Sequence, residues 1–228
     1  MAGKSTAATQ RSNQIDVSKK VVLQDFIYAS IKERIINCEI APGEILNENS
    51  FAEEFGTSRT PIREALLRLQ RDRLVTIYPR QGTFASQISL KDVYEIFDIR
   101  LLIEPTIARQ VSEIIDLEKI EEFRQQFTDR ALAEIYYKKW FYLDRRFHDF
   151  LVESTGNETL MRTYQDVMDQ HLRVRILAGK LPTRASDTND EHIRILTAFA
   201  ERDADAAERC MQEHIIASRE AAVKLDRY

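Results

Sequence analysis

Apolar residues recur at helical spacing along most of the chain. Near the N-terminus, Ile27, Ile31 and Ile35 fall on one helical face because positions four apart are neighbours on a helix. Gly56 follows a short apolar segment and suits the left-handed backbone that ends a helix. The helices predicted in this part of the chain span residues 22–37, 48–55 and, from Ser58, to about 73.

A strand-like pattern follows the third helix. Residues 74–78 are rich in β-branched and aromatic side chains, which predicts a strand. Residues 80–82 read Arg-Gln-Gly and predict a turn, and residues 83–85 are the predicted second strand of a hairpin. Residues 44–46 are long enough only for a single edge strand. Three helices followed directly by a hairpin are the order of a winged helix-turn-helix, which is a DNA-binding fold.

Beyond Ser89 the apolar spacing is helical throughout. We therefore predict a mainly α fold, with an N-terminal winged helix-turn-helix domain and a C-terminal all-α six-helix bundle. The predicted bundle helices are 90–113, 117–131, 132–154, 157–178, 188–201 and 203–226. The predicted division is a disordered arm over 1–20, where the sequence is polar and lacks periodicity, a winged domain over 21–86 and a helical domain over 87–228.

Composition narrows the class of protein. The chain has 228 residues, 43% of them hydrophobic and 31% charged, and no apolar run is long enough to span a membrane. Its N-terminus has no apolar core of a secretory signal. Two separated cysteines do not make a disulfide framework or a thiolate metal site. We expect a cytoplasmic protein with reduced thiols and no membrane partner.

The net charge of −4 is unevenly distributed. The first 87 residues carry 12 lysines and arginines against 10 acids, and the remainder carries 21 against 27. Six of the arginines lie within residues 57–82, where positive charge suits a phosphate backbone. A solvated helix face is the alternative interpretation of that charge.

The start of the third helix carries the sharpest DNA-binding pattern. Ser58 and Thr60 are both residue types that cap helix N-termini. Arg59 and Arg63 lie one turn apart beside the buried stripe. N-terminal side chains of a recognition helix contact base edges and phosphates, so the two arginines are predicted DNA contacts.

Polar residues fall on inward faces of the helical domain. Asp144 and His148 share a helical face with aromatic residues, and His192 and His214 each lie on an apolar face of a later helix. An aspartate and three histidines directed at one core predict a metal centre, and residues four apart on a helix can bind one ion. The alternatives are core histidines with ordinary partners and an Asp144 paired with an arginine.

Two further residues are candidates for a pocket. His171 lies near Val167, Met168 and Leu172 and is assigned to it. Arg100 precedes Glu104 by four residues, which indicates either an ion pair on a solvated face or a guanidinium that clamps a ligand carboxylate.

These motifs resemble a known family. The segments IAPGE at 40–44, LNE at 46–48 and FAEEFGTSRTPIREAL at 51–66 resemble the N-terminal domain of the GntR family of bacterial transcription regulators. The Asp144-x3-His148 pair, with His192 and His214, resembles the FCD effector domain of the FadR subfamily. A domain of about six helices is more similar to the shorter VanR-type branch.

The resemblance implies a homodimer that binds a palindromic double-stranded DNA operator, often as a repressor. It implies Gly82 as a wing-tip glycine near the minor groove, whereas Asn49 replaces an arginine that contacts DNA in some relatives. The residues assigned to DNA are Ser58, Arg59, Thr60, Arg63, Arg80 and Gly82.

The resemblance also implies that the Asp144 and histidine set binds a divalent metal ion, zinc foremost, with nickel or manganese as alternatives. A small organic acid effector could complete the coordination, with Arg100 as its second anchor. The prediction is therefore a regulator and not an enzyme. The alternatives are a metal-dependent hydrolase fused to a DNA-binding domain and a regulator with a purely structural metal.

Overall fold

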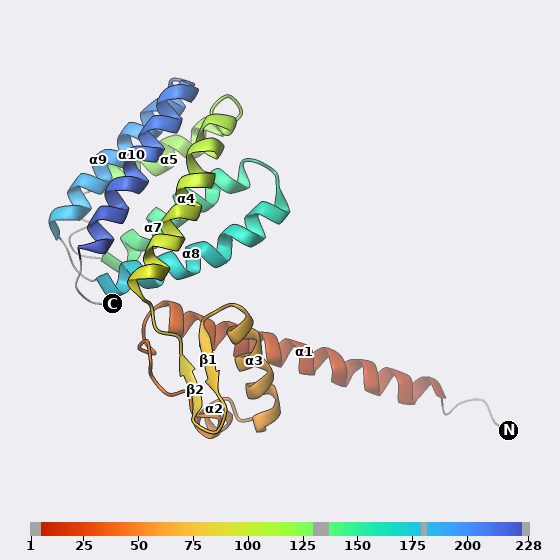
Figure 1. Cartoon of the computed structure of the whole chain (residues 1–228). Helices are drawn as coiled ribbons and strands as arrows, with labels where there is room; N and C mark the ends of the chain where they lie inside the picture. The colour runs from red at the N-terminus through yellow and green to blue at the C-terminus, as the bar shows by residue number, and fades with distance from the viewer. Residues whose placement is uncertain (1–5, 130–136, 179–181, 225–228) are drawn as a thin grey trace. The chain divides into compact units, whose positions relative to one another are not determined.

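The computed structural model describes residues 6–129, 137–178 and 182–224 (Figure 1). The chain divides into two compact units, Met1–Gln87 and Ile88–Tyr228. We call them the N-terminal and C-terminal units. The predicted mainly helical fold is confirmed, and the division falls one residue from the boundary predicted at 86.

The N-terminal unit is a small helical domain with a two-stranded hairpin. Its buried core joins Ile27, Ile31 and Ile35 of the first helix to Ile62 and Leu66 of the third, and each of these side chains is at most 1% exposed. The isoleucine stripe predicted from the sequence is thus the face that packs. The elements are α1 (Thr6–Ile36), α2 (Glu48–Glu54), α3 (Arg59–Arg71), β1 (Val75–Tyr78) and β2 (Gly82–Ala85).

The first helix corrects one prediction. Residues 1–20 were expected to form a disordered arm, but α1 begins at Thr6. The sequence has no glycine or proline between Gly3 and Pro42, so no residue in this stretch breaks a helix. The helix therefore continues towards the N-terminus through residues that have no clear apolar face. Residues 1–5 of the predicted arm lie outside the described ranges.

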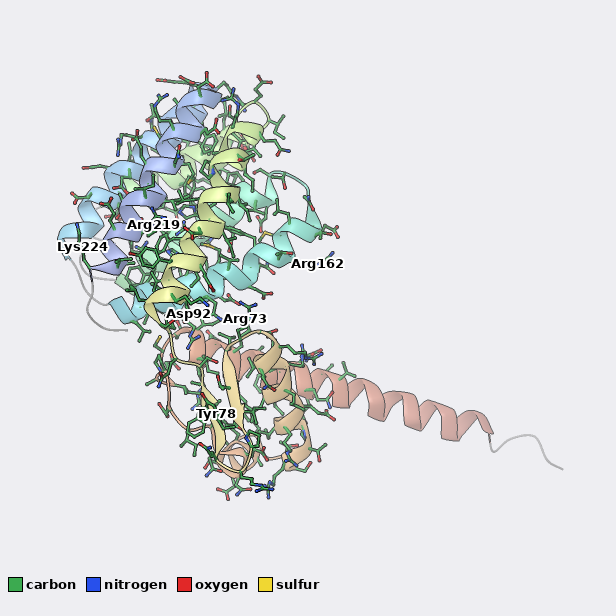
Figure 2. The ribbon with its side chains drawn as sticks, in the orientation of Figure 1. Arg73, Tyr78, Asp92, Arg162, Arg219 and Lys224 are labelled. Atoms are coloured by element: carbon green, nitrogen blue, oxygen red, sulfur yellow. The ribbon has the colours of Figure 1, made fainter. Side chains whose placement is uncertain are left out.

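The hairpin has the register expected of a wing. Val75 pairs with Ala85 and Tyr78 pairs with Gly82 in an antiparallel ladder. The Gln81 N–H donates to the Tyr78 carbonyl at 3.1 Å, which closes a turn with Arg80 at a φ of 65°. Tyr78 lies at the end of β1 (Figure 2). The centroids of its ring and of the Phe84 ring lie 5.8 Å apart.

The predicted edge strand at 44–46 is present as an isolated bridge. Ile45 pairs with Phe84 beside β2, and the Leu46 N–H donates to the Thr83 carbonyl at 2.7 Å. One bridge fits the short segment available between Gly43 and the helix that starts at Glu48. The segment anchors the chain before α2 to the wing.

The described part of the C-terminal unit contains six helices. They are α4 (Leu90–Val111), α5 (Leu117–Thr128), α7 (Tyr137–Glu153), α8 (Glu158–Ala178), α9 (Pro182–Ala200) and α10 (Ala204–Val223). The predicted helix 188–201 begins six residues earlier, at Pro182, because proline is tolerated in a first turn. Parts of the predicted helix 132–154, of the break at 179–182 and of the segment 225–226 lie outside the described residues.

These helices enclose one hydrophobic core. In Figure 1, α10 runs beside α4, and α9 packs against both α5 and α10. Arg219 of α10 pairs with Asp98 of α4 at 3.2 Å (Figure 2). Inside the core, the ring centroids of Phe123 and Phe147 lie 5.5 Å apart. The bundle thereby brings the inward faces of helices far apart in the sequence to one centre.

None of the helices in the described ranges combines the length and apolar character needed to cross a membrane.

The wing offers a first prediction, on stability. Gly82 has a φ of 132°, and a Cβ added there would lie 3.5 Å from Ile45 and Phe84. Gly82→Ala should lower the free energy of unfolding of the N-terminal unit by about 1–3 kcal/mol, because L-residues are strained at this φ. Urea denaturation would measure it. Gln81→Ala, an exposed wing substitution, is the control, and equal stability of the two variants would contradict the prediction.

Candidate functional site

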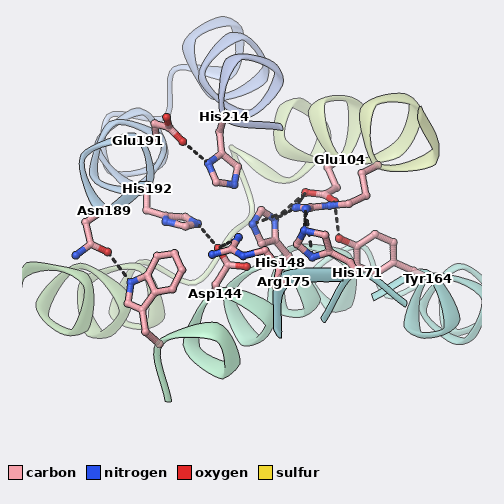
Figure 3. Close-up of polar contacts among 12 residues, drawn as sticks. Glu104, Asp144, His148, Tyr164, His171, Arg175, Asn189, Glu191, His192 and His214 are labelled. Atoms are coloured by element: carbon pink, nitrogen blue, oxygen red, sulfur yellow. Dashed lines mark hydrogen bonds and ion pairs between the residues drawn. The ribbon is translucent and has the colours of Figure 1, made fainter. Parts of the chain in front are cut away.

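Four buried polar side chains meet in the core of the C-terminal unit. Asp144 and His148 lie one turn apart on α7, His192 comes from α9 and His214 from α10. One ligand atom from each lies within 4.8 Å of the others, and all four residues are at most 2% exposed (Figure 3). The structure therefore brings together the four residues that the sequence predicted as a set.

Aromatic packing fixes the histidine rings. The His192 ring stacks on Phe127 with centroids 4.2 Å apart and planes 10° from parallel. The rings of His148 and His214 stack at 5.2 Å. The inward face of α7, with Phe147 beside His148, carries both the apolar contacts and the polar cluster. The same helical periodicity that buries the aromatic residues thus delivers the ligand atoms.

Several atoms of this cluster lack hydrogen bonds. Asp144 Oδ1, both ring nitrogens of His192 and His214 Nε2 are buried and have no hydrogen-bond partner among the residues that the structure describes. Asp144 Oδ1 lies 3.6 Å from Arg175 Nη1 and 3.4 Å from His192 Nε2. Buried polar atoms are ordinarily paired, so this group of unpaired donors and acceptors needs an explanation. A divalent metal ion would satisfy Asp144 Oδ1, His214 Nε2 and one ring nitrogen of His192, and the residues fit such an ion.

The electrostatics favour the metal-binding protonation states. Burial lowers the pKa of His192 and of His214 well below the usual value, so both rings are neutral near pH 7. Burial alone would raise the pKa of Asp144, but the nearby positive charge, that of Arg175 foremost, outweighs it and lowers the pKa. A carboxylate and neutral imidazoles are the forms that bind metal ions.

A second buried network adjoins the cluster. Arg100 Nε donates to Glu104 Oε1 at 2.5 Å and Nη2 donates to Oε2 at 3.2 Å. Arg100 Nη1 lies 2.7 Å from His171 Nε2, and the Tyr164 hydroxyl donates to Glu104 Oε1 at 2.7 Å. Burial and then the charge of Arg100 also lower the pKa of His171. Arg100 Nη2 also lies 3.3 Å from His148 Nε2, so the guanidinium has an internal carboxylate and two imidazoles as partners.

This network corrects one interpretation of Arg100. The i, i+4 pair with Glu104 exists, but it does not lie on a solvated face, because Arg100 is 0% and Glu104 1% exposed. The spacing of Arg100 and Glu104 indicated the pair. It did not indicate that the pair is buried, because partners such as Tyr164 come from another helix.

Other contacts of the site had weak signals in the sequence. Glu191 Oε2 lies 2.9 Å from His214 Nδ1, and Trp140 Nε1 donates to Asn189 Oδ1 at 2.7 Å. The guanidinium of Arg175 also lies 4.8 Å from the Trp140 ring centroid. Glu191 directly precedes His192, and that adjacency is the only hint that the sequence offered.

The predicted DNA-binding residues lie on the surface of the N-terminal unit. Ser58 is the N-cap residue of α3, in an extended conformation and without a side-chain capping bond. Arg59 and Arg63 have side chains 64% and 69% exposed, and each lies within 4 Å of Glu48, at 3.7 Å and 3.4 Å. Such exposed ion pairs are weak, so phosphates or bases can replace them. Thr60 is also exposed.

The remaining predicted DNA contacts lie in the wing. Arg80 is exposed in the turn and Gly82 starts β2. Asn49 is exposed on α2, and its backbone N–H donates to Asn47 Oδ1 at 2.9 Å. Helix α3 and the hairpin thus both present polar groups to solvent.

Comparison with known proteins identifies both units. Residues 23–85 match the family described as bacterial regulatory proteins, gntR family, and residues 95–217 match the FCD domain. The chain belongs to the GntR family and carries an FCD domain. It is a transcriptional regulator, and its N-terminal unit is a DNA-binding helix-turn-helix domain.

Relatives of this GntR protein agree with that assignment. The HTH-type transcriptional repressor RspR of Escherichia coli (strain K12) is 30% identical to it, over 83% of this chain and 84% of RspR. Two solved structures share the fold at 19% identity. Escherichia coli McbR/YncC has a TM-score of 0.74 over 88% of this chain and 96% of its own. A GntR regulator from Rhodococcus sp. RHA1 has a TM-score of 0.76 over 87% and 96%. These regulators give no support to the hydrolase alternative.

The neutral buried histidines generate a prediction on pH. Three lowered pKa values mean that the unfolded chain binds more protons once the pH falls below about 6.5, the ordinary value for histidine. The stability that these neutral histidines contribute to the metal-free protein is therefore fully present above that pH and is lost as the pH falls below it. We expect about 1 kcal/mol lost per histidine between pH 7.5 and 5.5. Urea denaturation at both values measures it, and an unchanged free energy of unfolding would contradict it.

Proposed function

We propose that this GntR regulator is a repressor that binds a palindromic operator as a homodimer, and that a small carboxylate metabolite at a metal centre changes its operator affinity. The observation that carries the proposal is the buried set of Asp144, His148, His192 and His214 with its unpaired ligand atoms. The name of the relative RspR includes the word repressor, which supports the direction of control. Binding to DNA implies action in the cytoplasm.

Zinc is the proposed ion, with nickel or manganese as alternatives. Three imidazoles and one carboxylate are zinc ligands, and bonds of about 2.0–2.1 Å place the ligand atoms of a tetrahedral site about 3.3 Å apart. His192 Nε2 and Asp144 Oδ1 already lie 3.4 Å apart. The widest separation, within 4.8 Å, needs only small side-chain adjustments.

The proposed effector is a small organic acid. Its carboxylate would bind the metal as a fifth ligand, which expands the tetrahedral arrangement, and Arg100 and His171 are the proposed anchors for the rest of the molecule. Arg100 already holds Glu104 and His171, so an effector carboxylate would exchange with these contacts. A ligand changes operator affinity only if it binds the DNA-competent and incompetent states differently.

On the DNA side, we propose that Arg59 and Arg63 contact base edges or phosphates, with Ser58 and Thr60 beside them. Arg80 and Gly82 are the proposed wing contacts. Exposure of the two recognition-helix arginines supports this role. The six helices in the described part of the C-terminal unit support placement in the VanR-like branch of the FadR subfamily.

A regulator with a purely structural metal is the second candidate. The Arg100–Glu104 contact favours it, because the guanidinium that would bind an effector already has a carboxylate partner. In that case the metal would stabilise the bundle without changing operator affinity.

Substitutions on α3 test the DNA-binding role. Arg59→Ala or Arg63→Ala should weaken binding to an operator selected from random DNA by about 1–3 kcal/mol, the value of one specific base contact. Fluorescence anisotropy measures the affinity. Arg71→Ala, in the exposed last turn of the same helix, is the matched control. Unchanged affinity in both test variants would refute the assignment.

A thermal-shift screen tests the effector. With zinc bound, one or more organic acids should raise the melting temperature, and the same acids should have no effect after chelation, because the metal supplies part of their binding site. The active acids should then change operator affinity in a gel-shift titration. A chelator that lowers the melting temperature, together with DNA binding that no acid changes, would instead establish the purely structural metal.

A further inference from the structure

Two of the three cluster histidines have a carboxylate on the ring nitrogen Nδ1. Glu104 Oε2 lies 2.7 Å from His148 Nδ1, and Glu191 Oε2 lies 2.9 Å from His214 Nδ1. A ring that donates its Nδ1–H to a carboxylate is held in one tautomer, which leaves Nε2 with the lone pair that binds a metal.

The carboxylate of Glu104 comes from outside the three helices that carry the ligands. It belongs to α4, and Arg100 Nε and Nη2 donate to its two oxygens at 2.5 and 3.2 Å. The Tyr164 hydroxyl of α8 adds a bond at 2.7 Å. Glu104, Arg100 and Tyr164 are at most 1% exposed, so solvent does not compete for these contacts. Arg100 and Tyr164 therefore hold Glu104 in place independently of its contact with His148.

The other histidines provide an internal comparison. Within the described ranges, His192 has no hydrogen-bond partner on either ring nitrogen, and stacking on Phe127 holds its ring. Packing alone thus orients one ligand of the cluster. At His148 the ring additionally faces a carboxylate that three donors fix in place, which is an arrangement suited to setting a tautomer.

We propose that Glu104 is a positioning residue for the metal centre: it holds His148 with Nδ1 protonated, so that the lone pair for the ion is on Nε2, which lies 3.3 Å from Arg100 Nη2 in this structure. The proposal rests on the metal centre proposed above. It also makes α4 part of that centre, because the residue that orients a ligand is bound by Arg100 of the same helix. A substitution at Arg100 should therefore change metal affinity. A ligand that binds Arg100 and changes metal affinity by some factor should have its own affinity changed by that same factor when the metal binds.

The test measures Zn²⁺ affinity by competition with a chromophoric chelator at pH 7.5, with the full-length protein. Glu104→Gln should weaken Zn²⁺ binding about 10–100-fold, the usual effect of losing a partner of a metal ligand. Tyr164→Phe removes one bond to Glu104 and leaves the His148 contact, so a smaller loss is expected. Asp169→Asn is the control, because it removes a buried carboxylate 2.5 Å from Arg145 Nη1. It should leave Zn²⁺ affinity unchanged.

Nuclear magnetic resonance adds a readout that a purely structural role would not change. In the zinc-bound protein the His148 Nδ1 proton should resonate far downfield, and it should move upfield in Glu104→Gln because an amide is a weaker acceptor. If Glu104→Gln does not fold, the same proton in Tyr164→Phe decides: a shift supports the proposal, and an unchanged resonance overturns it.

The outcomes separate the two levels of the account. A wild-type protein that fails to bind Zn²⁺ would overturn the metal centre itself. A wild-type protein that binds Zn²⁺, together with a folded Glu104→Gln variant of equal affinity, would overturn only the role of Glu104.

Discussion

Burial of ionisable groups inside the C-terminal bundle is the constraint on which the site depends. Asp144, Glu104 and Arg100 are at most 2% exposed, and a buried charge is costly unless it is paired. Glu104 and Arg100 neutralise each other at 2.5 Å, with Tyr164 as a third partner. Asp144 has looser contacts, with Arg175 at 3.6 Å and His192 at 3.4 Å. The paired network and the incompletely paired cluster therefore lie side by side, and the proposed cation would complete the second.

The geometry also suggests how such a site can control a regulator. The ligand atoms come from three helices, so an ion bound to them ties α7, α9 and α10 together. Glu104 extends these contacts to α4, which begins at Leu90, only a few residues after β2 ends at Ala85. A ligand that redistributes the contacts of Arg100 would thus act on the first helix after the DNA-binding unit. Coupling of this kind requires only two states that the ligand binds differently.

Helical periodicity predicted much of this from the sequence alone. Spacing on α7 placed Asp144 and His148 on an inward face, and they lie there because the same face carries Phe147. Periodicity did not reveal the burial of the Arg100–Glu104 pair, since its partner Tyr164 lies 60 residues away on another helix. Nor did polarity predict that α1 starts at Thr6, because an unbroken helix needs no amphipathic face of its own. What local spacing misses is set by contacts between distant segments.

Zinc K-edge X-ray absorption of the zinc-loaded protein tests the central claim most directly. The account predicts a first shell of nitrogen and oxygen at about 2.0–2.1 Å, with the outer-shell scattering of three imidazole rings. His192→Ala should reduce that scattering by one ring, because His192 Nε2 is a proposed ligand. A spectrum that lacks imidazole scattering, or that is the same in this variant, would contradict a metal centre built from Asp144, His148, His192 and His214.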